Sequence, residues 1–126
     1  MGERNRAADW MAQAENDLAF AHSALAGGFY AQCCFICQQA GEKALKSLAL
    51  RRGAKAIFTH SLYALCTSLD LDRGVESASK RLDRYYVAAR YPDALPGGAP
   101  FQLFERDEAE EALRLAQTIL DAVRGA

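Results

Sequence analysis

Apolar residues recur at steps of three and four along most of this chain, and this period restricts its fold more than any other feature. The first such stripe consists of Ala7, Met11, Ala14, Leu18, Ala21 and Leu25. Steps of three and four place side chains on one face of an α-helix. Sustained two-residue alternation, which is typical of strands, is missing from the sequence. The pattern therefore predicts an all-α protein.

Stripes with the same period predict further helices. Over residues 30–51 the stripe is Cys34, Cys37, Gly41, Ala44 and Leu48, and over 75–89 it is Val75, Ala78, Leu82, Tyr85 and Ala89. The last stripe, over 107–123, is Ala109, Ala112, Ala116, Ile119 and Val123, and a shorter helix carries Leu62, Leu65, Cys66 and Leu69. With the helix over 6–26 these make about five helices. Short connections between most of them predict an antiparallel bundle with an up-and-down four-helix core.

Local signals set the expected ends of these helices. Gly27-Gly28 ends the first helix, Thr59 is the expected N-cap of the short helix, and Asp107 with Glu110 resembles a capping box. Pro92 stops the helix over 75–89, and residues 93–103 are rich in Gly and Pro, which predicts a loop. Gly41 lies on a packing stripe, so we expect a neighbouring helix to approach it closely.

Length and composition indicate one soluble domain over residues 1–126. Apolar residues make up 51% and charged residues 25%, which is typical of a globular chain and not of a disordered one. No apolar run reaches the roughly 20 residues that a membrane helix needs. Residues 1–6 lack the apolar core of a signal peptide, so we expect a cytoplasmic protein. Some apolar and aromatic residues exceed what one narrow stripe per helix would bury. They either form a subunit interface or thicken the core, and we expect a homodimer. Among them are Phe29, Phe35, Tyr63 and Tyr86.

The cysteines and the charges suggest few specific sites. Cys33, Cys34, Cys37 and Cys66 fall in apolar helical stretches, which favours buried thiols over a metal or redox site. We expect no metal and no cofactor. Residues 42–60 hold five cations against one acid, so this basic cluster either attracts phosphate or is an ordinary solvated surface.

The strongest candidate for a functional group is Arg90. Pro92 restricts the residue before it, so the turn holding Arg90 and Tyr91 is fixed at the end of a helix. A guanidinium suits phosphate, although Arg90 could instead form an ion pair with Asp83 or Asp93. Tyr91 could stack on a base or brace the turn, and Asp93 could orient Arg90.

Several motifs together resemble the HEPN family of small helical domains. They are the segment from Gln38 to Leu48, His60-Ser61-Leu62, Leu82-Asp83-Arg84-Tyr85-Tyr86, Arg90-Tyr91-Pro92-Asp93, and Glu108 to Ala112. The resemblance runs from Trp10 to about Val123. It implies a helical bundle that is often dimeric and is associated with nucleotide binding, RNA cleavage and partnership with minimal nucleotidyltransferases in toxin-antitoxin pairs.

The ribonuclease members of that family carry Arg, then four to six residues, then His. Here the window falls on Leu95, Pro96 and Gly97, so the histidine is missing. His60 could replace it as a base, but its place at an expected helix start favours a hydrogen-bonding role. Glu42 and Lys46 have the spacing of an exposed ion pair. The resemblance implies instead that Glu42, Lys43 and Lys46 border a polar groove, but we favour the ion pair. The candidate nucleotide- or RNA-binding residues are Arg90, Tyr91, Asp93, Arg84, Lys43 and Lys46, with no catalytic or metal-binding residue.

Three hypotheses follow for the function. The first is an interaction protein that binds a nucleotide or RNA at Arg90 and works beside a separately encoded nucleotidyltransferase. The second is a metal-independent endoribonuclease in which Arg90 stabilises the reacting phosphate and another group acts as base. The third is a purely structural helical partner. The missing histidine counts against the second hypothesis, so we expect binding without cleavage.

Overall fold

The apolar stripes meet in one continuous core in the computed structural model, which describes residues 6–126. Residues 1–5, which entered the signal-peptide argument, lie outside the described residues. The main helices are α1 (Ala7–Ala26), α2 (Tyr30–Arg51), α4 (Arg73–Asp83) and α7 (Arg106–Gly125). The shorter ones are α3 (Leu62–Ser68), α5 (Tyr85–Ala88), the 3-10 helix η1 (Pro92–Ala94) and α6 (Pro100–Leu103). No strand occurs in the described part, so the all-α prediction is confirmed.

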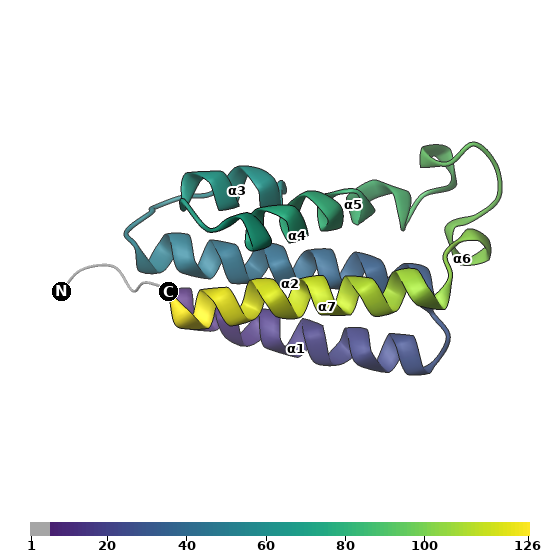
Figure 1. Cartoon of the computed structure of the whole chain (residues 1–126), viewed down its shortest axis with the longest axis horizontal. Helices are drawn as coiled ribbons and strands as arrows, with labels where there is room; N and C mark the ends of the chain where they lie inside the picture. Colours follow the sequence, from purple (N-terminus) through teal and green to yellow (C-terminus); the bar gives the residue numbers. More distant parts are fainter. Residues whose placement is uncertain (1–5) are drawn as a thin grey trace.

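The three long helices α1, α2 and α7 lie side by side (Figure 1). Helix α2 runs between α1 and the layer formed by α3, α4 and α5. Successive members of the set α1, α2, α4–α5 and α7 run in opposite directions, as expected for an up-and-down bundle (Figure 1). The segment from η1 to α6 lies at the end of the bundle opposite the C-terminus (Figure 1). None of the helices between residues 6 and 126 is both long and apolar enough to cross a membrane.

Gly41 is a point of close approach between α2 and its neighbours. A Cβ atom at this position would lie 2.7 Å from Leu62 Cδ2 on α3 and 3.3 Å from Ile119 Cδ1 on α7. The close approach expected from the sequence is therefore confirmed. It lets α3 and α7 pack against the middle of α2 and fixes the position of the segment that precedes α3.

The helix predicted over 75–89 is divided in two. At Arg84 the backbone amide bonds to the Arg81 carbonyl at 3.3 Å, an i to i−3 bond that tightens the chain locally. Helix α4 therefore ends before Arg84, and α5 begins directly after it. Helix α4 also begins earlier than predicted, because the Asp72 carboxylate accepts a bond from Val75 N at 3.0 Å and caps it.

Two further boundary predictions are wrong by two residues. The N-cap of α3 is Ser61, whose hydroxyl accepts from Ala64 N at 3.1 Å, while Thr59 Oγ1 accepts from Ser61 N. The N-cap of α7 is Glu105, whose backbone amide donates to the Glu108 carboxylate at 3.1 Å. In both places several neighbouring residues could serve as a cap, and tertiary packing selects one of them.

The segment predicted as a loop over 93–103 contains the helical turns η1 and α6. Both begin with a proline, Pro92 and Pro100. Proline fits the first helical position because its fixed φ suits a helix and its missing N–H would have no partner there. Pro92, which stops the preceding helix, therefore starts η1, and Pro100 starts α6.

Candidate functional site

The Arg90 corner forms where the sequence places it. Helix α5 ends at Ala88, and the backbone amides of Arg90 and Tyr91 both bond to the Val87 carbonyl, at 3.0 and 3.2 Å. Tyr91 is extended, with φ −124° and ψ 130°, as expected for a residue before proline. The chain thus turns away from α5 directly after Arg90.

Aromatic rings hold the Arg90 guanidinium. Its Cζ atom lies 4.3 Å from the ring centre of Phe35 on α2, 4.6 Å from that of Tyr86 and 4.9 Å from that of Tyr91. These distances are within the range of cation–π attraction. The Nε atom donates to the Tyr86 carbonyl at 2.7 Å. We call these four residues, Phe35, Tyr86, Arg90 and Tyr91, the arginine box.

The guanidinium has no acidic partner among residues 6–126. Asp83, one proposed partner, accepts bonds from Leu62 N at 2.7 Å, Tyr63 N at 3.0 Å and the Ser61 hydroxyl at 3.2 Å. Asp93, the other, is exposed in η1 and forms no ion pair with Arg90 in the described chain. The ion-pair interpretations of Arg90 are therefore wrong. Its two terminal nitrogens keep their donors free for an anion.

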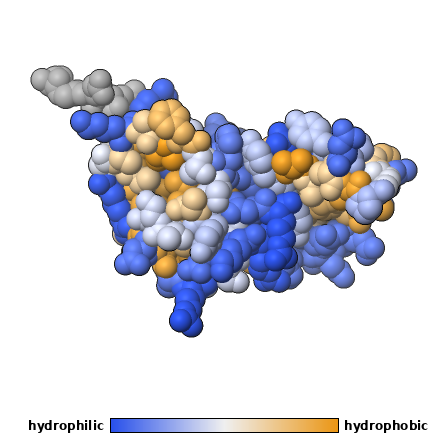
Figure 2. Space-filling view, turned by 90° about the horizontal axis from the view of Figure 1, so that it is seen from above, coloured by the Kyte–Doolittle hydropathy of each residue, from blue (hydrophilic) through white to orange (hydrophobic). Residues whose placement is uncertain are grey.

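An apolar pocket of about 460 Å³ opens beside the arginine box. Arg90 is the only charged residue among those that line it, namely Phe20, Ala31, Gln32, Phe35, Ile36, Ala89, Arg90, Pro92, Ala99, Pro100 and Phe101. Phe20 and Phe101 are 55% and 70% exposed. Apolar surface gathers at this end of the molecule, where the η1–α6 segment lies (Figure 2). The pocket can take a flat apolar group whose anionic end reaches Arg90.

His60 reaches the same group of rings from the α2–α3 connection. Its imidazole stacks on Tyr86 with a centroid distance of 4.9 Å and an interplanar angle of 19°. Its Nδ1 atom lies 3.2 Å from Glu42 Oε1. His60 therefore does not cap α3. It contacts the ring that also holds Arg90, a proximity that the sequence did not reveal.

Glu42 and Lys46 form a buried ion pair, which corrects the predicted exposed one. Lys46 Nζ lies 3.0 Å from Glu42 Oε2, and both side chains are less than a tenth exposed. The Lys46 ammonium also lies 5.6 Å from the Trp10 ring centre. Lys43 pairs with the buried Asp17 on α1. Both ammonium groups are thus paired within the protein, although Lys43 also lines an open pocket with Arg6, Asp9 and Gln13, and Lys46 lines a smaller one with Trp10 and Lys55.

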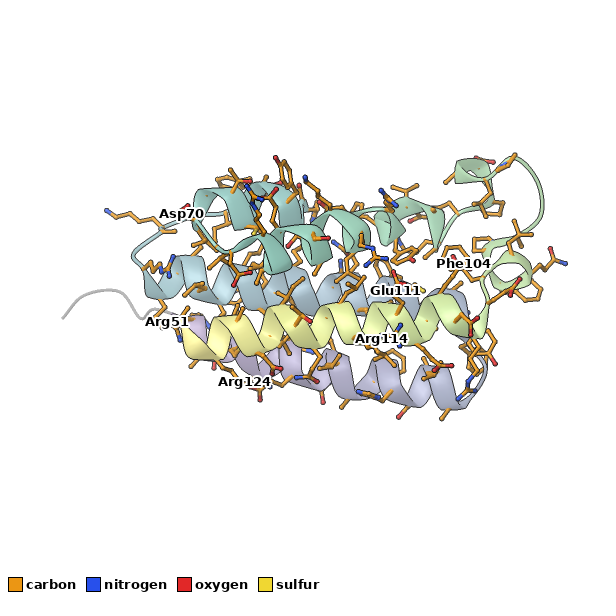
Figure 3. The ribbon with its side chains drawn as sticks, in the orientation of Figure 1. Arg51, Asp70, Phe104, Glu111, Arg114 and Arg124 are labelled. Carbon is orange, nitrogen blue, oxygen red and sulfur yellow. The ribbon has the colours of Figure 1, made fainter. Side chains whose placement is uncertain are left out.

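The remaining arginines of the predicted basic cluster bind backbone carbonyls. Arg51 donates to Val123 O and Ala126 O, both at 2.9 Å, and Arg52 donates to Leu69 O at 2.8 Å. Arg51 lies near the C-terminal end of α7, whereas Phe104 marks the opposite end, where the pocket opens (Figure 3). Arg51 and Arg52 therefore tie helix ends together, while Arg51, Arg52 and Lys55 remain exposed at the surface.

Of the six candidate site residues, the structure brings two together. Arg90 and Tyr91 contact each other in the arginine box. Arg84 is exposed between α4 and α5, and Asp93 is exposed within η1, so neither belongs to the box. The site prediction missed Tyr86, which lies one helical turn before Arg90. It also missed Phe35 and His60. Both come from elements distant in sequence, so no local pattern could have assigned them to this site.

Burial raises the pKa of two of the cysteines and of Tyr85. All four thiols are buried, as predicted, and burial raises the pKa of Cys34 and of Cys66 above the usual range. The described residues contain no group of three or more His, Cys, Asp or Glu that could hold a metal ion. Burial also raises the pKa of Tyr85 to about 12. The Tyr85 ring packs edge-on against Phe104 at 5.7 Å.

Comparison with known families and structures gives consistent matches over almost the whole chain. The family model for the HEPN domain matches residues 7–126. The crystal structure of TT1696 from Thermus thermophilus is similar with 44% identity and a TM-score of 0.91, covering 97% of this chain and 98% of that one. None of the curated proteins compared with the chain is significantly similar to it.

Two further crystal structures support the match. ST0689, an archaeal HEPN homologue, is 36% identical with a TM-score of 0.85, covering 97% of this chain and 98% of that one. A HEPN domain protein (tm0613) from Thermotoga maritima is 32% identical with a TM-score of 0.74, covering 93% of this chain and 95% of that one.

Proposed function

The chain belongs to the HEPN domain family, and from this premise we propose that it binds a nucleotide or a segment of RNA at the arginine box. In this role it is an interaction protein that works beside a separately encoded minimal nucleotidyltransferase, in a pair of the toxin-antitoxin kind. The observation that carries the proposal is a guanidinium held by three rings, with free donors and no carboxylate among its partners in the described chain.

The surroundings of Arg90 fit the two halves of a nucleotide. Guanidinium donors match phosphate oxygens in pairs, and charge-assisted bonds of this kind are among the stronger hydrogen bonds. The adjoining pocket offers aromatic and proline side chains to a base, and base–aromatic stacking tolerates any sequence. Its volume of about 460 Å³ lies within the range of small-molecule pockets. The ligand places its phosphate on Arg90 and its base in the pocket.

The distribution of charge predicts a low affinity and binding at the arginine box alone. The chain has a formal net charge of −1, so no broad positive field draws nucleic acid to it. The lysines Lys43 and Lys46 of α2 are paired with acids. One arginine carries the contact, so we expect affinity that falls with salt by the slope of about one phosphate contact.

Fluorescence anisotropy with a labelled oligoadenylate of about six nucleotides tests the proposal. We expect Arg90→Ala to lower the affinity about tenfold or more, which corresponds to a lost charge-assisted bond. The slope of log K against log salt should flatten by about 0.7. Arg114→Ala, on the exposed side of α7 (Figure 3), is the matched control and should leave both values unchanged. Equal affinities for the wild type and Arg90→Ala would contradict the proposal.

We also propose that the protein is a homodimer that uses its exposed apolar residues. Phe29 is 58% exposed, Phe101 70% and Leu103 46%. Phe35 and Tyr86, two other surplus aromatic residues, are used in the arginine box instead. Light scattering at micromolar concentration should give the mass of a dimer, and a monomer would contradict it.

A neighbouring reading frame with a Gly-Ser pair and spaced aspartates would support the nucleotidyltransferase partner.

One contact favours a second function, that of a metal-independent endoribonuclease. His60 shares the Tyr86 ring with Arg90, so an imidazole lies near the guanidinium although the motif histidine is replaced by Leu95. A purified wild-type protein that cleaves RNA without metal, and loses this activity in both Arg90→Ala and His60→Gln, would establish it. We expect binding without cleavage, because Leu95 cannot transfer a proton.

A further inference from the structure

We propose that His60 is a second phosphate-binding group of this site, and that the site takes ligands with two adjacent phosphates. The inference rests on the proposed function of Arg90 as the first phosphate-binding group. It concerns a histidine outside the motif window and a contact across Tyr86, and it narrows the ligand from any nucleotide to a diphosphate or a short strand.

Glu42 fixes the orientation of the imidazole. His60 Nδ1 lies 3.2 and 3.3 Å from the two carboxylate oxygens of Glu42. The carboxylate is itself held by Lys46 Nζ at 3.0 Å and by Gln38 Nε2 at 3.3 Å. Gln38 Nε2 also donates to the His60 carbonyl at 3.3 Å. One edge of the ring is therefore anchored in the bundle, and Nε2 forms no hydrogen bond with any described residue.

The free edge of the imidazole faces solvent. The His60 side chain is 59% exposed although its Glu42 anchor is only 6% exposed. A protonated imidazole that donates Nδ1–H to a carboxylate still has Nε2–H to donate to a phosphate oxygen. Glu42 is thus a positioning residue for His60.

Tyr86 sets the spacing between the two cationic groups. The imidazole is stacked on the phenol ring at 4.9 Å, and the guanidinium carbon lies 4.6 Å from the same ring centre. Two groups cannot occupy one position over a ring, so the imidazole and the guanidinium are held apart around Tyr86. Both groups lie within 4.9 Å of the ring centre of Tyr86, so two neighbouring phosphates of one ligand can reach them both.

The acids nearest the pair already have partners within the protein. On α2, Glu42 is paired with Lys46. On α4, the Asp83 carboxylate is occupied by two backbone amides and the Ser61 hydroxyl. Arg90 keeps its terminal donors free, and the Nε2 edge of His60 adds a second polar group beside it. An anion with two charges in sequence matches this arrangement.

Isothermal titration with AMP, ADP and the dinucleotide pApA tests the proposal. The wild type should bind ADP or pApA about tenfold more tightly than AMP. His60→Gln should reduce this advantage to less than about twofold, and His60→Arg should restore it. Whichever of ADP and pApA shows the advantage identifies the diphosphate or the strand as the ligand.

The two histidines of the chain provide a matched control. His22 is exposed on α1, so His22→Gln should keep the advantage. In that variant His60 is the only imidazole, and its proton resonances should shift with ADP or pApA but not with AMP, even if His60→Gln fails to fold.

The outcomes separate the two proposals. Binding of AMP that depends on Arg90, with no gain from a second phosphate or with a gain that survives His60→Gln, overturns the role of His60 and leaves the role of Arg90 intact. Binding of AMP and ADP that is equal in the wild type and Arg90→Ala, or no binding at all, overturns both.

Discussion

Two groups of charged residues in this bundle differ in how their charge is neutralised. Between α1 and α2, Lys43 pairs with Asp17 and Lys46 with Glu42, and both acids are buried. In the arginine box, Arg90 is held by rings and by one backbone carbonyl, and no acid of the described chain pairs with it. The first group is complete within the protein, whereas the second still has donors to offer.

The difference shows that the number of cations in a segment does not tell how many of them are already paired with acids. The lysine-rich part of α2 carries more positive charge in sequence than the Arg90 corner, yet its ammonium groups already have carboxylate partners. Burying a charge is tolerated when it is paired and hydrogen-bonded. A guanidinium held by rings keeps its charge and its free edge, and this is what an anionic ligand needs.

The largest expected effect is the loss of stability when the buried ion pair of Glu42 and Lys46 is broken. Glu42→Ala leaves Lys46 buried without its acid, so we expect the free energy of unfolding to fall by about 3 kcal/mol or more. Urea denaturation followed by circular dichroism measures this change. The matched control is Glu76→Ala, which removes the exposed partner of Lys80 and should cost less than about 1 kcal/mol. Equal losses in the two variants would mean that burial of the pair carries no stability.

A smaller effect is expected in the arginine box. Arg90→Ala removes ring contacts and the bond to the Tyr86 carbonyl, but it leaves no buried charge unpaired. We therefore expect a loss of about 1 kcal/mol in the free energy of unfolding, together with the loss of ligand affinity. The same urea experiment applies. A loss as large as that of Glu42→Ala would make Arg90 a structural residue and remove the contrast between the two regions.

The smallest effect concerns Tyr85, beside the arginine box. Burial raises the pKa of its phenol from 10 to about 12, so the folded state favours the neutral form. This contribution to stability is fully present below the unfolded pKa and is lost as the pH rises from about 10 through 12. Thermal unfolding between these values should show a shallower fall for Tyr85→Phe than for the wild type. Parallel curves would show that another group, such as a buried thiol, causes the fall.

The periodic parts of the fold were predictable from the sequence. The range of α2 agrees with its stripe, and Gly41 marks the close approach of α3 and α7. Caps were less predictable, since Thr59 and Ser61 are both good caps and only packing decides between them. The break at Arg84 lies within an unbroken stripe, so the periodicity contained no sign of it.

The site was only partly predictable, because a sequence pattern reports on residues that are close together in the chain. Pro92 locates the Arg90 corner because it acts on its immediate neighbours. Phe35 reaches Arg90 from another element, as His60 reaches Tyr86, and no local rule connects residues so far apart in the chain. The burial of Lys46 likewise depends on how α1 packs on α2, which a helix surface pattern does not contain.

Chemical shift mapping with AMP on the ¹⁵N-labelled protein tests the contrast most directly. The account predicts that the Arg90 Nε signal and the backbone amides from Tyr86 to Tyr91 shift in a saturable way, while the amides around Asp17 and Lys43 stay unchanged. Saturable shifts centred on Lys43 and Lys46, with Arg90 unaffected, would contradict it.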